Sequence, residues 1–517
     1  MAQANGARFL FLIECTGPHW IAIGRELLDR GWKILLWTGA AAQAEAVRAL
    51  SSDIVYAPND KAVRAVLPFE PTSARVLDGP MKERIATEKQ IALEMMDRLD
   101  PDGRSMSFRE RSLHFDVLAN QWLRVLDDLR PDAVVFSMAP HIVYDYVLYA
   151  VARLQGLPTP MFDRSAIAGR LLLLDDIYDA RHQVLRFQAE APANPQLEGD
   201  VAAELDRMRA RGAHAFAPTF AKKVNALGLG QKLGDHPYGP GGFARFLAGE
   251  LRAAASEAAG RRTRANYIKL RASRLQDSWP SLGRRVQLRL AGALTKRKLW
   301  GIYEALVSRP EPETPYVYFA LHFQPERATC PMAWNLGDQI TVAAMLATAL
   351  PPGWKLVVKE HPWQLQPRSR GEYGRSGEFY ERLAAIPNVH LAPIGDDSNA
   401  LTRGARAVVT ATGSAGWEAI CNSVPALLFG SPWYAGAPGV HPIRSSEDCV
   451  MALAAVQAGA RPEPRALERF LWALQRATVW GTLEPLLETA DISTSEAAAS
   501  MADALHHRLL AACGKAA

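Results

Sequence analysis

Short apolar runs separated by amphipathic stretches set the pattern of the first part of the chain. Residues 8–14 and 33–39 are nearly continuous apolar runs, which are typical of strands buried on both faces of a sheet. Between them, residues 19–30 place apolar side chains on one helical face, and Gly31 follows. Because strand, helix and strand follow one another through short connections, the pattern predicts the start of an open parallel sheet.

The same alternation returns later in this part. It predicts helices and strands in turn over 117–129, 133–138, 144–155 and 157–163. After residue 185 the alternation stops, and Ala- and Arg-rich helical stretches surround a Gly/Pro-rich break at 234–243. We therefore expect a Rossmann-like first domain over residues 1–185, followed by a basic helical insertion over residues 186–315.

A second series of strands and helices begins at Tyr316. Apolar runs predict strands over 316–322, 355–361, 389–393, 407–412 and 426–430. The stretches between them predict helices over 337–349, 377–386, 397–404 and 415–422. This order predicts a second doubly wound, Rossmann-like domain over residues 316–460, with further helices over residues 461–517.

Composition excludes several classes of protein. The 517 residues are too many for one ordinary core, and 49% hydrophobic with 22% charged residues argue against long disorder. No apolar stretch approaches the roughly 20 residues of a membrane-spanning helix, and the N-terminal run is too short for a secretory signal. The five scattered cysteines have neither a disulfide-framework nor a metal-site spacing. We therefore expect a cytoplasmic protein.

The net charge of +5 is concentrated in one segment. Residues 250–298 hold thirteen Lys or Arg against three Asp or Glu. This basic segment fits a solvated helical face or, as the alternative, a peripheral contact with an anionic surface such as the inner membrane, or with a polyanionic glycan. We do not expect nucleic acid as a partner, because no recognised binding motif accompanies the charge.

One polar cluster of the second domain opens the helix after the strand at 407–412. Gly413, Ser414 and Gly416 are small, so that backbone amides at the helix start can approach a phosphate with the helix dipole assisting. Glu418 lies in the first turns of the same helix and can face a ribose hydroxyl pair. The alternative is a tight strand-to-helix turn with Ser414 as the N-cap residue.

Two further clusters follow neighbouring strands. Lys359 and His361 end the strand at 355–361, where an ammonium or imidazole suits a phosphate leaving group. Gln324 and Glu326 lie in the loop after the first strand of the domain. Because the carboxyl ends of parallel strands meet at one edge, where open sheets bind ligands, we predict that all three clusters bind a nucleotide-sugar.

The first domain offers candidates for the catalytic group. His19 follows the first strand at the start of a helix, whose N-terminus favours the neutral imidazole of a general base, and Glu14 is the adjacent carboxylate. His141 and Asp145 are four residues apart at a predicted helix start, and Asp145 is the candidate nucleophile of a retaining reaction. A third local ligand for a metal is missing, so we predict no metal site.

These motifs resemble those of bacterial capsule and surface-carbohydrate biosynthesis proteins, a group that includes the Kdo transferases of capsule linker synthesis. The resemblance is carried over 316–440 by YFALHFQPERAT, KEHP, TGSAGWEAI and FGSPWYAGAPGV, with a weaker match over 136–180. It implies a GT-B fold with the activated sugar held mainly by the second domain. It also implies His361 and Ser414 at the donor phosphate and Glu418 at the ribose.

Sequence and resemblance together predict a glycosyltransferase that moves a sugar from a CMP- or UDP-linked donor. The acceptor is expected to be a surface or capsular polysaccharide or its lipid-linked precursor. No cofactor is expected, since the nucleotide-sugar is a substrate. Two alternatives stay open: a nucleotide-sugar epimerase or hydrolase of the same fold, and a non-catalytic scaffold of polysaccharide assembly.

Overall fold

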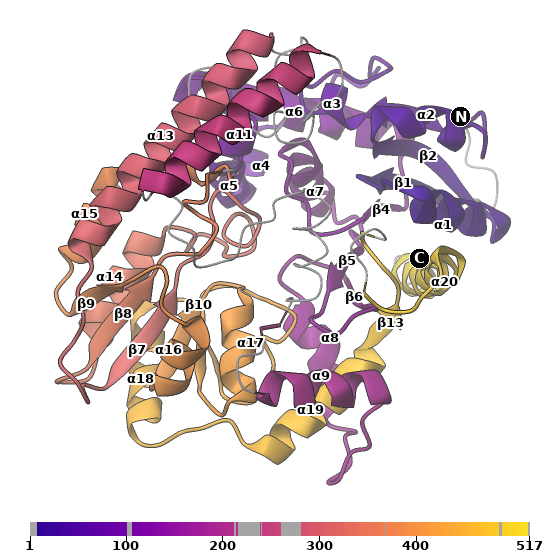
Figure 1. Ribbon diagram of the computed structural model, residues 1–517. Coiled ribbons are helices and arrows are strands. Elements are labelled where there is room, and N and C mark those ends of the chain that lie inside the picture. The colour runs from indigo at the N-terminus through magenta and orange to yellow at the C-terminus, as the bar shows by residue number, and fades with distance from the viewer. Residues whose placement is uncertain are drawn as a thin grey trace. The chain divides into compact units, whose positions relative to one another are not determined.

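The computed structural model divides the chain into two compact α/β units, each built on its own sheet (Figure 1). Unit 1 comprises residues 1–96, 106–204 and 468–517, and unit 2 comprises residues 97–105 and 205–467. The structure describes residues 8–100, 106–210, 214–215, 238, 240–259, 281–367, 369–484 and 489–514. The predicted boundary at residue 185 therefore lies within unit 1, and the terminal helices return to that unit.

Unit 1 contains a seven-stranded sheet in the order β13-β6-β5-β4-β1-β2-β3. Its strands are β1 Arg8–Ile13, β2 Trp32–Gly39, β3 Val55–Pro58, β4 Ala133–Phe136, β5 Met161–Arg164, β6 Arg170–Leu174 and β13 Thr478–Trp480. Strands β1 to β5 pair in parallel, whereas β6 runs antiparallel to β5, and β13 antiparallel to β6. The sheet reverses its direction of growth between β1 and β4, which makes this point the topological switch point of unit 1.

The core of unit 1 joins its first helix to the last helix of the chain. Apolar side chains of α1 (Pro18–Asp29) and α20 (Thr494–Cys513) bury against each other, among them Trp20, Leu27, Met501 and Leu505. Figure 1 shows the two helices side by side. The other helices of this unit are α2 Ala44–Arg48, α3 Asn59–Ala62, α4 Gly79–Arg84, α5 Ala86–Met95, α6 Phe108–Leu129, α7 Tyr144–Leu154 and α8 Ala180–Gln188.

Unit 2 contains a six-stranded sheet in the order β12-β11-β10-β7-β8-β9, with every pair parallel. Its strands are β7 Tyr316–Ala320, β8 Lys355–Lys359, β9 Val389–Ala392, β10 Ala407–Thr410, β11 Ala426–Leu428 and β12 Val440–Pro442. Growth of the sheet reverses between β7 and β10, and the loops after these strands are where doubly wound sheets bind ligands. Two such units confirm the predicted fold class.

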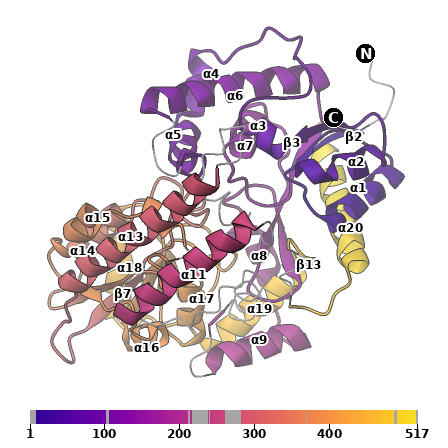
Figure 2. The same cartoon turned by 45° about the horizontal axis from the view of Figure 1, so that its top comes forward.

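The helices of unit 2 include two long ones that precede its sheet in sequence. Helices α11 (Pro240–Ala258) and α13 (Leu282–Leu306) lie side by side in both ribbon views (Figures 1 and 2). The sheet is also covered by α14 Gln339–Ala349, α15 Gly377–Ala384, α16 Ser398–Gly404, α17 Ser414–Cys421 and α18 Ser446–Gln457. Helices α9 (Gly199–Arg209) and α19 (Pro464–Ala477) cross the boundaries of the two units in sequence.

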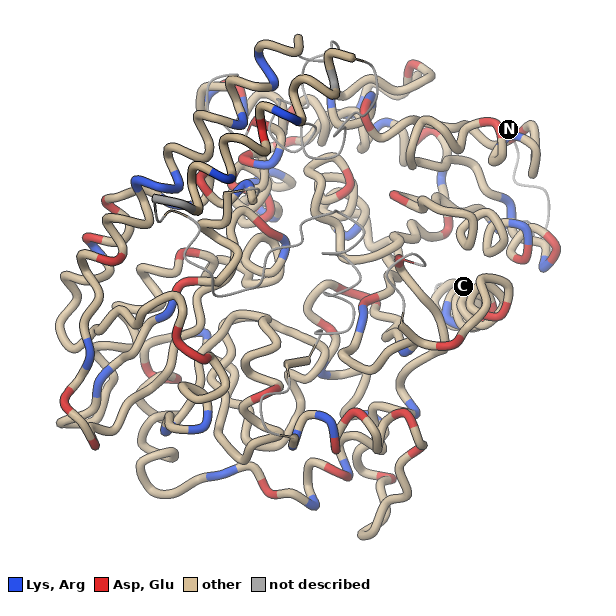
Figure 3. Tube along the Cα trace, in the orientation of Figure 1, with Lys and Arg blue, Asp and Glu red and all other residues tan. Residues whose placement is uncertain are grey.

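Part of the basic segment 250–298 is not a solvated face. Figure 3 shows its Lys and Arg residues along α11 and α13, and two of them are buried. Arg289 Nε lies 3.3 Å from Glu250 Oε2, and Lys296 Nζ lies 3.1 Å from Glu372 Oε2. Both charges are buried and paired inside unit 2, which corrects the expectation of a solvated or membrane-facing segment for these two residues. Residues 260–280, with most of the remaining charge, lie outside the described residues.

Candidate functional site

His322 links the loop after β7 to the end of β10 and the loop that follows it. The Nε2 atom of His322 accepts a hydrogen bond from the Ala411 amide at 2.8 Å and lies 2.8 Å from Thr410 Oγ1. Burial lowers the pKa of His322 to about 4, so the ring is neutral near pH 7. This residue therefore joins the two loops of the switch point, and sequence reasoning missed it although it is the last residue of the strand predicted over 316–322.

His361 follows β8 and is oriented by its own loop. Its Nδ1 atom accepts a hydrogen bond from the Trp363 amide at 3.2 Å. Burial, with His322 and Lys359 adding to it, lowers the pKa of His361 to about 3. A neutral ring whose Nδ1 is an acceptor carries its proton on Nε2, so His361 is a neutral hydrogen-bond donor at this edge.

Lys359 supplies a cation at the end of the same strand. The side chain is buried, and Nζ donates to Ser398 Oγ at 3.0 Å. Burial lowers its pKa to about 8, against the opposing effect of nearby Asp396 and Glu360. The group is therefore still mostly an ammonium near pH 7 and loses its proton just above that pH.

The start of α17 presents backbone amides at the same edge. Gly413 is the N-cap residue and Ser414 is the first helical residue, so the alternative of Ser414 as N-cap is wrong. The amide of Gly413 donates to Thr410 Oγ1 at 3.1 Å, whereas the amides of Ser414 and Ala415 donate to no described residue. Two such amides at a helix N-terminus can donate hydrogen bonds to an anion.

The glycines of this turn are explained by protein contacts. A Cβ on Gly413 would lie 2.7 Å from Thr410 Oγ1, and one on Gly416 would lie 2.5 Å from Tyr434 Oη. The Tyr434 hydroxyl also donates to the Gly413 carbonyl. Small residues are therefore required here by packing inside unit 2, which is a different reason from the predicted approach of a phosphate to the backbone.

Glu418, the predicted ribose ligand, contacts another segment of its own unit. Its Oε1 accepts from the Ala215 amide at 3.0 Å, and its Oε2 lies 3.5 Å from His214 Nδ1. The contact with Glu418 raises the pKa of His214. Arg207 Nη1 donates to the His214 carbonyl at 2.7 Å, so the dipeptide 214–215 is held from both sides. The carboxylate of Glu418 is thus engaged by the chain itself.

Gln324 and Glu326, in the loop after β7, lie in different surroundings. Gln324 is partly buried, its amide donates to Gln364 Oε1 at 2.8 Å, and its side-chain oxygen accepts from Arg375. Glu326 is exposed. The structure therefore makes Gln324 a link between loops and leaves Glu326 at the surface.

In unit 1, Glu14 lies at the switch point on unusual backbone. It follows β1 with a φ of 55° and is partly exposed. Its Oε1 accepts from the Tyr144 hydroxyl at 2.5 Å, its Oε2 from Asn59 Nδ2 at 3.3 Å, and its amide donates to Thr38 Oγ1 at 2.9 Å. Side chains from two separate segments therefore hold the carboxylate, and a third holds the backbone of Glu14.

Asp145 is committed to the backbone around it. The carboxylate is buried and accepts from the amides of His141 at 2.9 Å, Ile142 at 2.7 Å and Tyr146 at 2.7 Å. Burial and the charge of Glu14 raise its pKa to about 7. His141 lies before α7 rather than on it, so of the two residues placed at the predicted helix start only Asp145 is helical. Asp145 thus shapes the loop, which disfavours it as nucleophile.

His19 is enclosed in unit 1. Its side chain is buried, and neither ring nitrogen has a hydrogen-bond partner among the described residues. Burial lowers its pKa to about 4. The direction agrees with the prediction, but the cause is desolvation rather than the helix N-terminus. An enclosed base with so low a pKa is a poor proton acceptor at pH 7, which disfavours His19 as the catalytic base.

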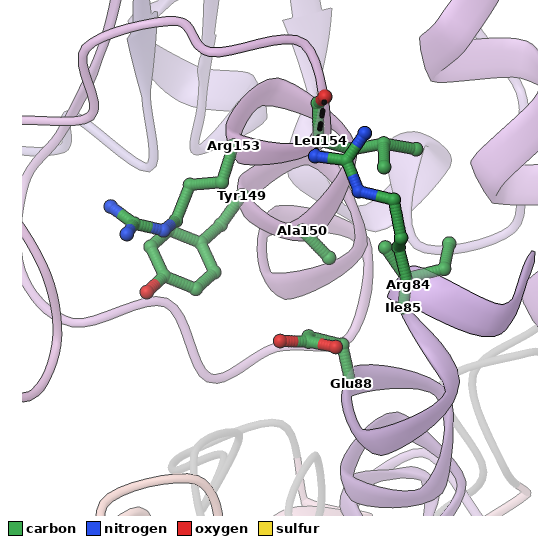
Figure 4. A pocket seen from close by; sticks show the side chains of 7 residues that line it. All are labelled: Arg84, Ile85, Glu88, Tyr149, Ala150, Arg153 and Leu154. Carbon is green, nitrogen blue, oxygen red and sulfur yellow. Dashed lines mark hydrogen bonds between the residues drawn. The ribbon is translucent and has the colours of Figure 1, made fainter. Parts of the chain in front are cut away.

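A small hollow elsewhere on unit 1 has no converging set of ligand-binding groups. Its volume is about 130 Å³, and Figure 4 shows the side chains that line it: Arg84, Ile85, Glu88, Tyr149, Ala150, Arg153 and Leu154. Arg84 Nη2 donates to the Leu154 carbonyl at 3.5 Å, and Arg153 Nη2 pairs with Asp176 at 2.8 Å. Both cations are thus engaged by the protein.

Neither a cluster of metal ligands nor a membrane-spanning helix occurs among the described residues. No three His, Cys, Asp or Glu side chains in the described parts of the chain gather as metal ligands, and the absence of a metal stays a prediction. Among the helices that the structure describes, none is both long and apolar enough to cross a membrane.

Part of unit 2 is similar to a known protein family. Residues 335–448 match the family described as capsule polysaccharide biosynthesis protein, which confirms the resemblance drawn from the motifs. The matched part includes β8, β10, α17 and the residues Lys359, His361 and Ser414. No curated protein matches the chain.

Solved structures with some likeness include two transferases from one organism. The beta Kdo 2,7 transferase of Thermosulfurimonas dismutans KpsC is 15% identical over 43% of this chain and 66% of that chain, with a TM-score of 0.23. The beta Kdo 2,4 transferase of KpsC is 13% identical over 68% and 82%, with a TM-score of 0.29. The chain thus spans slightly less than two thirds of the first. With such low scores, the fold rests on the strand order of the two sheets.

Proposed function

We propose that this protein is a glycosyltransferase that uses a nucleotide-linked sugar in the assembly of a bacterial surface polysaccharide. The family match over 335–448 supports the pathway, and the polar edge of unit 2 supports the use of a nucleotide donor. A CMP- or UDP-linked sugar is the proposed donor, and a capsular or other surface glycan, or its lipid-linked precursor, is the proposed acceptor. We further propose a cytoplasmic location, with peripheral contact at the inner membrane.

The single observation that carries the donor site is the chemistry of the groups that gather at the ends of β8 and β10. They are a neutral N–H donor on His361, the ammonium of Lys359, and the amides of Ser414 and Ala415, which donate to no residue that the structure describes. Donors and a cation held in place before the reaction stabilise the charge that develops on a leaving phosphate. Two negative side chains near this edge are engaged by the protein, Glu360 by Arg375 and Glu418 by Ala215.

We propose Glu14 as the catalytic group of unit 1. Of the three candidates it is the partly exposed one, because His19 and Asp145 are both buried. A carboxylate held by Tyr144 and Asn59 can accept the proton of an acceptor hydroxyl, which gives an inverted product, or attack the sugar itself, which gives a retained product. The anomeric configuration of the product, determined by NMR, decides between these two roles.

The test of the donor site starts with ligand binding. Thermal shift of the full chain with CMP, UDP and GDP identifies the nucleotide, and a chain that none of them stabilises contradicts the proposal. His361→Ala should then reduce turnover at least ~10²-fold, as expected for the loss of one electrostatic stabiliser. His390→Ala, in β9 of the same unit, is the matched control and should retain activity. Donor consumption without any acceptor would instead indicate an epimerase or hydrolase.

A further inference from the structure

A fully buried ion pair joins the loops of unit 2 that carry Gln324 and His361. Arg375 Nε lies 2.6 Å from Glu360 Oε2, and both side chains are wholly inaccessible to solvent. Arg375 Nη2 lies 3.1 Å from Glu360 Oε1, which makes the pair bidentate, and the Tyr380 hydroxyl donates to Oε2 at 2.7 Å. Desolvation offsets most of the attraction of a buried pair, so stability alone gives little reason to keep one.

Arg375 extends this pairing into the loop after β7. Its Nη1 donates to Gln324 Oε1 at 2.5 Å, and its Nη2 donates to the His322 carbonyl at 2.9 Å. Glu360 extends the pairing into the loop after β8, because its Oε1 accepts from the His361 amide at 2.6 Å. One guanidinium thus connects the backbone of both loops, and its planar fork has a geometry that lysine cannot reproduce.

The segment that carries Arg375 is packed without spare room. A Cβ on Gly374 would lie 2.5 Å from the Gln324 carbonyl oxygen, and one on Gly371 would lie 1.8 Å from the Gln364 carbonyl oxygen. Even a methyl group would therefore push this segment away from both loops. The close approach fixes the guanidinium between them.

We propose that Arg375 is a positioning residue for donor binding, which sets the distance between the loops that hold Gln324 and His361. This inference rests on the proposed function, since it assumes that the two loops bind the leaving phosphate. It assigns Arg375 no contact with the donor. Its loss should therefore displace His361 without removing any group that binds the nucleotide.

The test replaces both charges together, because Arg375→Met alone leaves an unpaired buried carboxylate. In Arg375→Met/Glu360→Gln, the amide oxygen of the new side chain can still accept from the His361 amide, and its NH2 group can donate to the Tyr380 hydroxyl. The matched control is Arg382→Met/Glu378→Gln, which removes an exposed ion pair at 2.6 Å between two residues of α15. Melting temperature, dissociation constants for CMP and UDP, and hydrogen exchange of peptides from 322–326 and 360–366 are measured for each.

We expect the double variant to melt closer to the wild type than Arg375→Met does. Its dissociation constant for the nucleotide that binds should rise at least ~10-fold, and both loops should exchange faster while β7 and β8 remain protected. Wild-type affinity together with unchanged exchange in both loops overturns the proposal. If neither nucleotide binds the wild type, the proposed function fails, and selective exchange in the two loops still decides whether Arg375 positions them.

Discussion

Replacing His19 by leucine should make unit 1 less sensitive to acid. The imidazole is buried, has no hydrogen-bond partner among the described residues, and has a pKa lowered to about 4. In the unfolded chain the same ring takes up a proton near its ordinary pKa of about 6.5. Between these two values the unfolded state binds more protons than the folded state, so the free energy of unfolding decreases as the pH falls through this window.

The magnitude follows from the two pKa values. A difference of about 2.5 units corresponds to about 3 kcal/mol below pH 4, and about 2 kcal/mol of this is already lost at pH 5. This loss in the free energy of unfolding therefore begins only as the pH falls through about 6.5. His19→Leu carries no such proton, and it removes two buried polar atoms that have no described partner. We expect the variant to be at least as stable as the wild type at pH 7.5.

Hydrogen exchange of α1 peptides in increasing urea, measured at pH 7.5 and pH 5, reports the stability of unit 1 alone. The difference in the free energy of unfolding between His19→Leu and the wild type should increase by about 2 kcal/mol at the lower pH. His182→Leu, at an exposed position of α8 in the same unit, is the control and should show no such increase. A difference of equal size at both pH values would refute the assignment of His19 as an enclosed neutral ring.

Two further predictions concern unit 2. Gly416→Ala should lower the free energy of unfolding by about 1–3 kcal/mol in thermal melts, because its Cβ would lie 2.5 Å from Tyr434 Oη. Adding Tyr434→Phe should restore part of this loss, and no recovery would contradict the proposed clash. The pKa of His214, followed by NMR, should fall in Glu418→Gln, because Glu418 raises it. The contact between the two side chains stabilises the fold most below pH 6.5, and this contribution is lost as the pH rises through the pKa of His214 in the folded protein. An unchanged pKa of His214 in the variant would show that the pair does not form.

The strands of both sheets were largely predictable because parallel strands are buried on both faces and appear as apolar runs. The run at 8–14 became β1, and that at 407–412 became β10. Strands β3 and β13 were missed because they are short and lie at the sheet edges, where few apolar positions are needed. The strand β6 was missed because an antiparallel turn after β5 leaves no helix between the strands to mark it.

The candidate site was predictable only where a residue ends a strand or lies in the short loop after it. Lys359 and Ser414 were found in this way, because the end of a strand is visible in the sequence. Arg375 lies in a loop, and its pairing with Glu360 depends on the folding of that loop over the edge of the sheet. The burial of His19 was equally invisible, since it depends on side chains brought together by tertiary structure.

The return of the chain to unit 1 has a consequence for the order in which the protein folds during synthesis. The buried face of α1 is covered by α20, and β6 is paired by β13, so segments made after unit 2 complete a unit that was begun before it. Buried Arg170 of β6 donates to the Gln475 carbonyl at 3.2 Å, which ties the two ends again. During synthesis, unit 1 therefore keeps apolar surface exposed until α20 has been made, whereas the sheet of unit 2 is complete before α20.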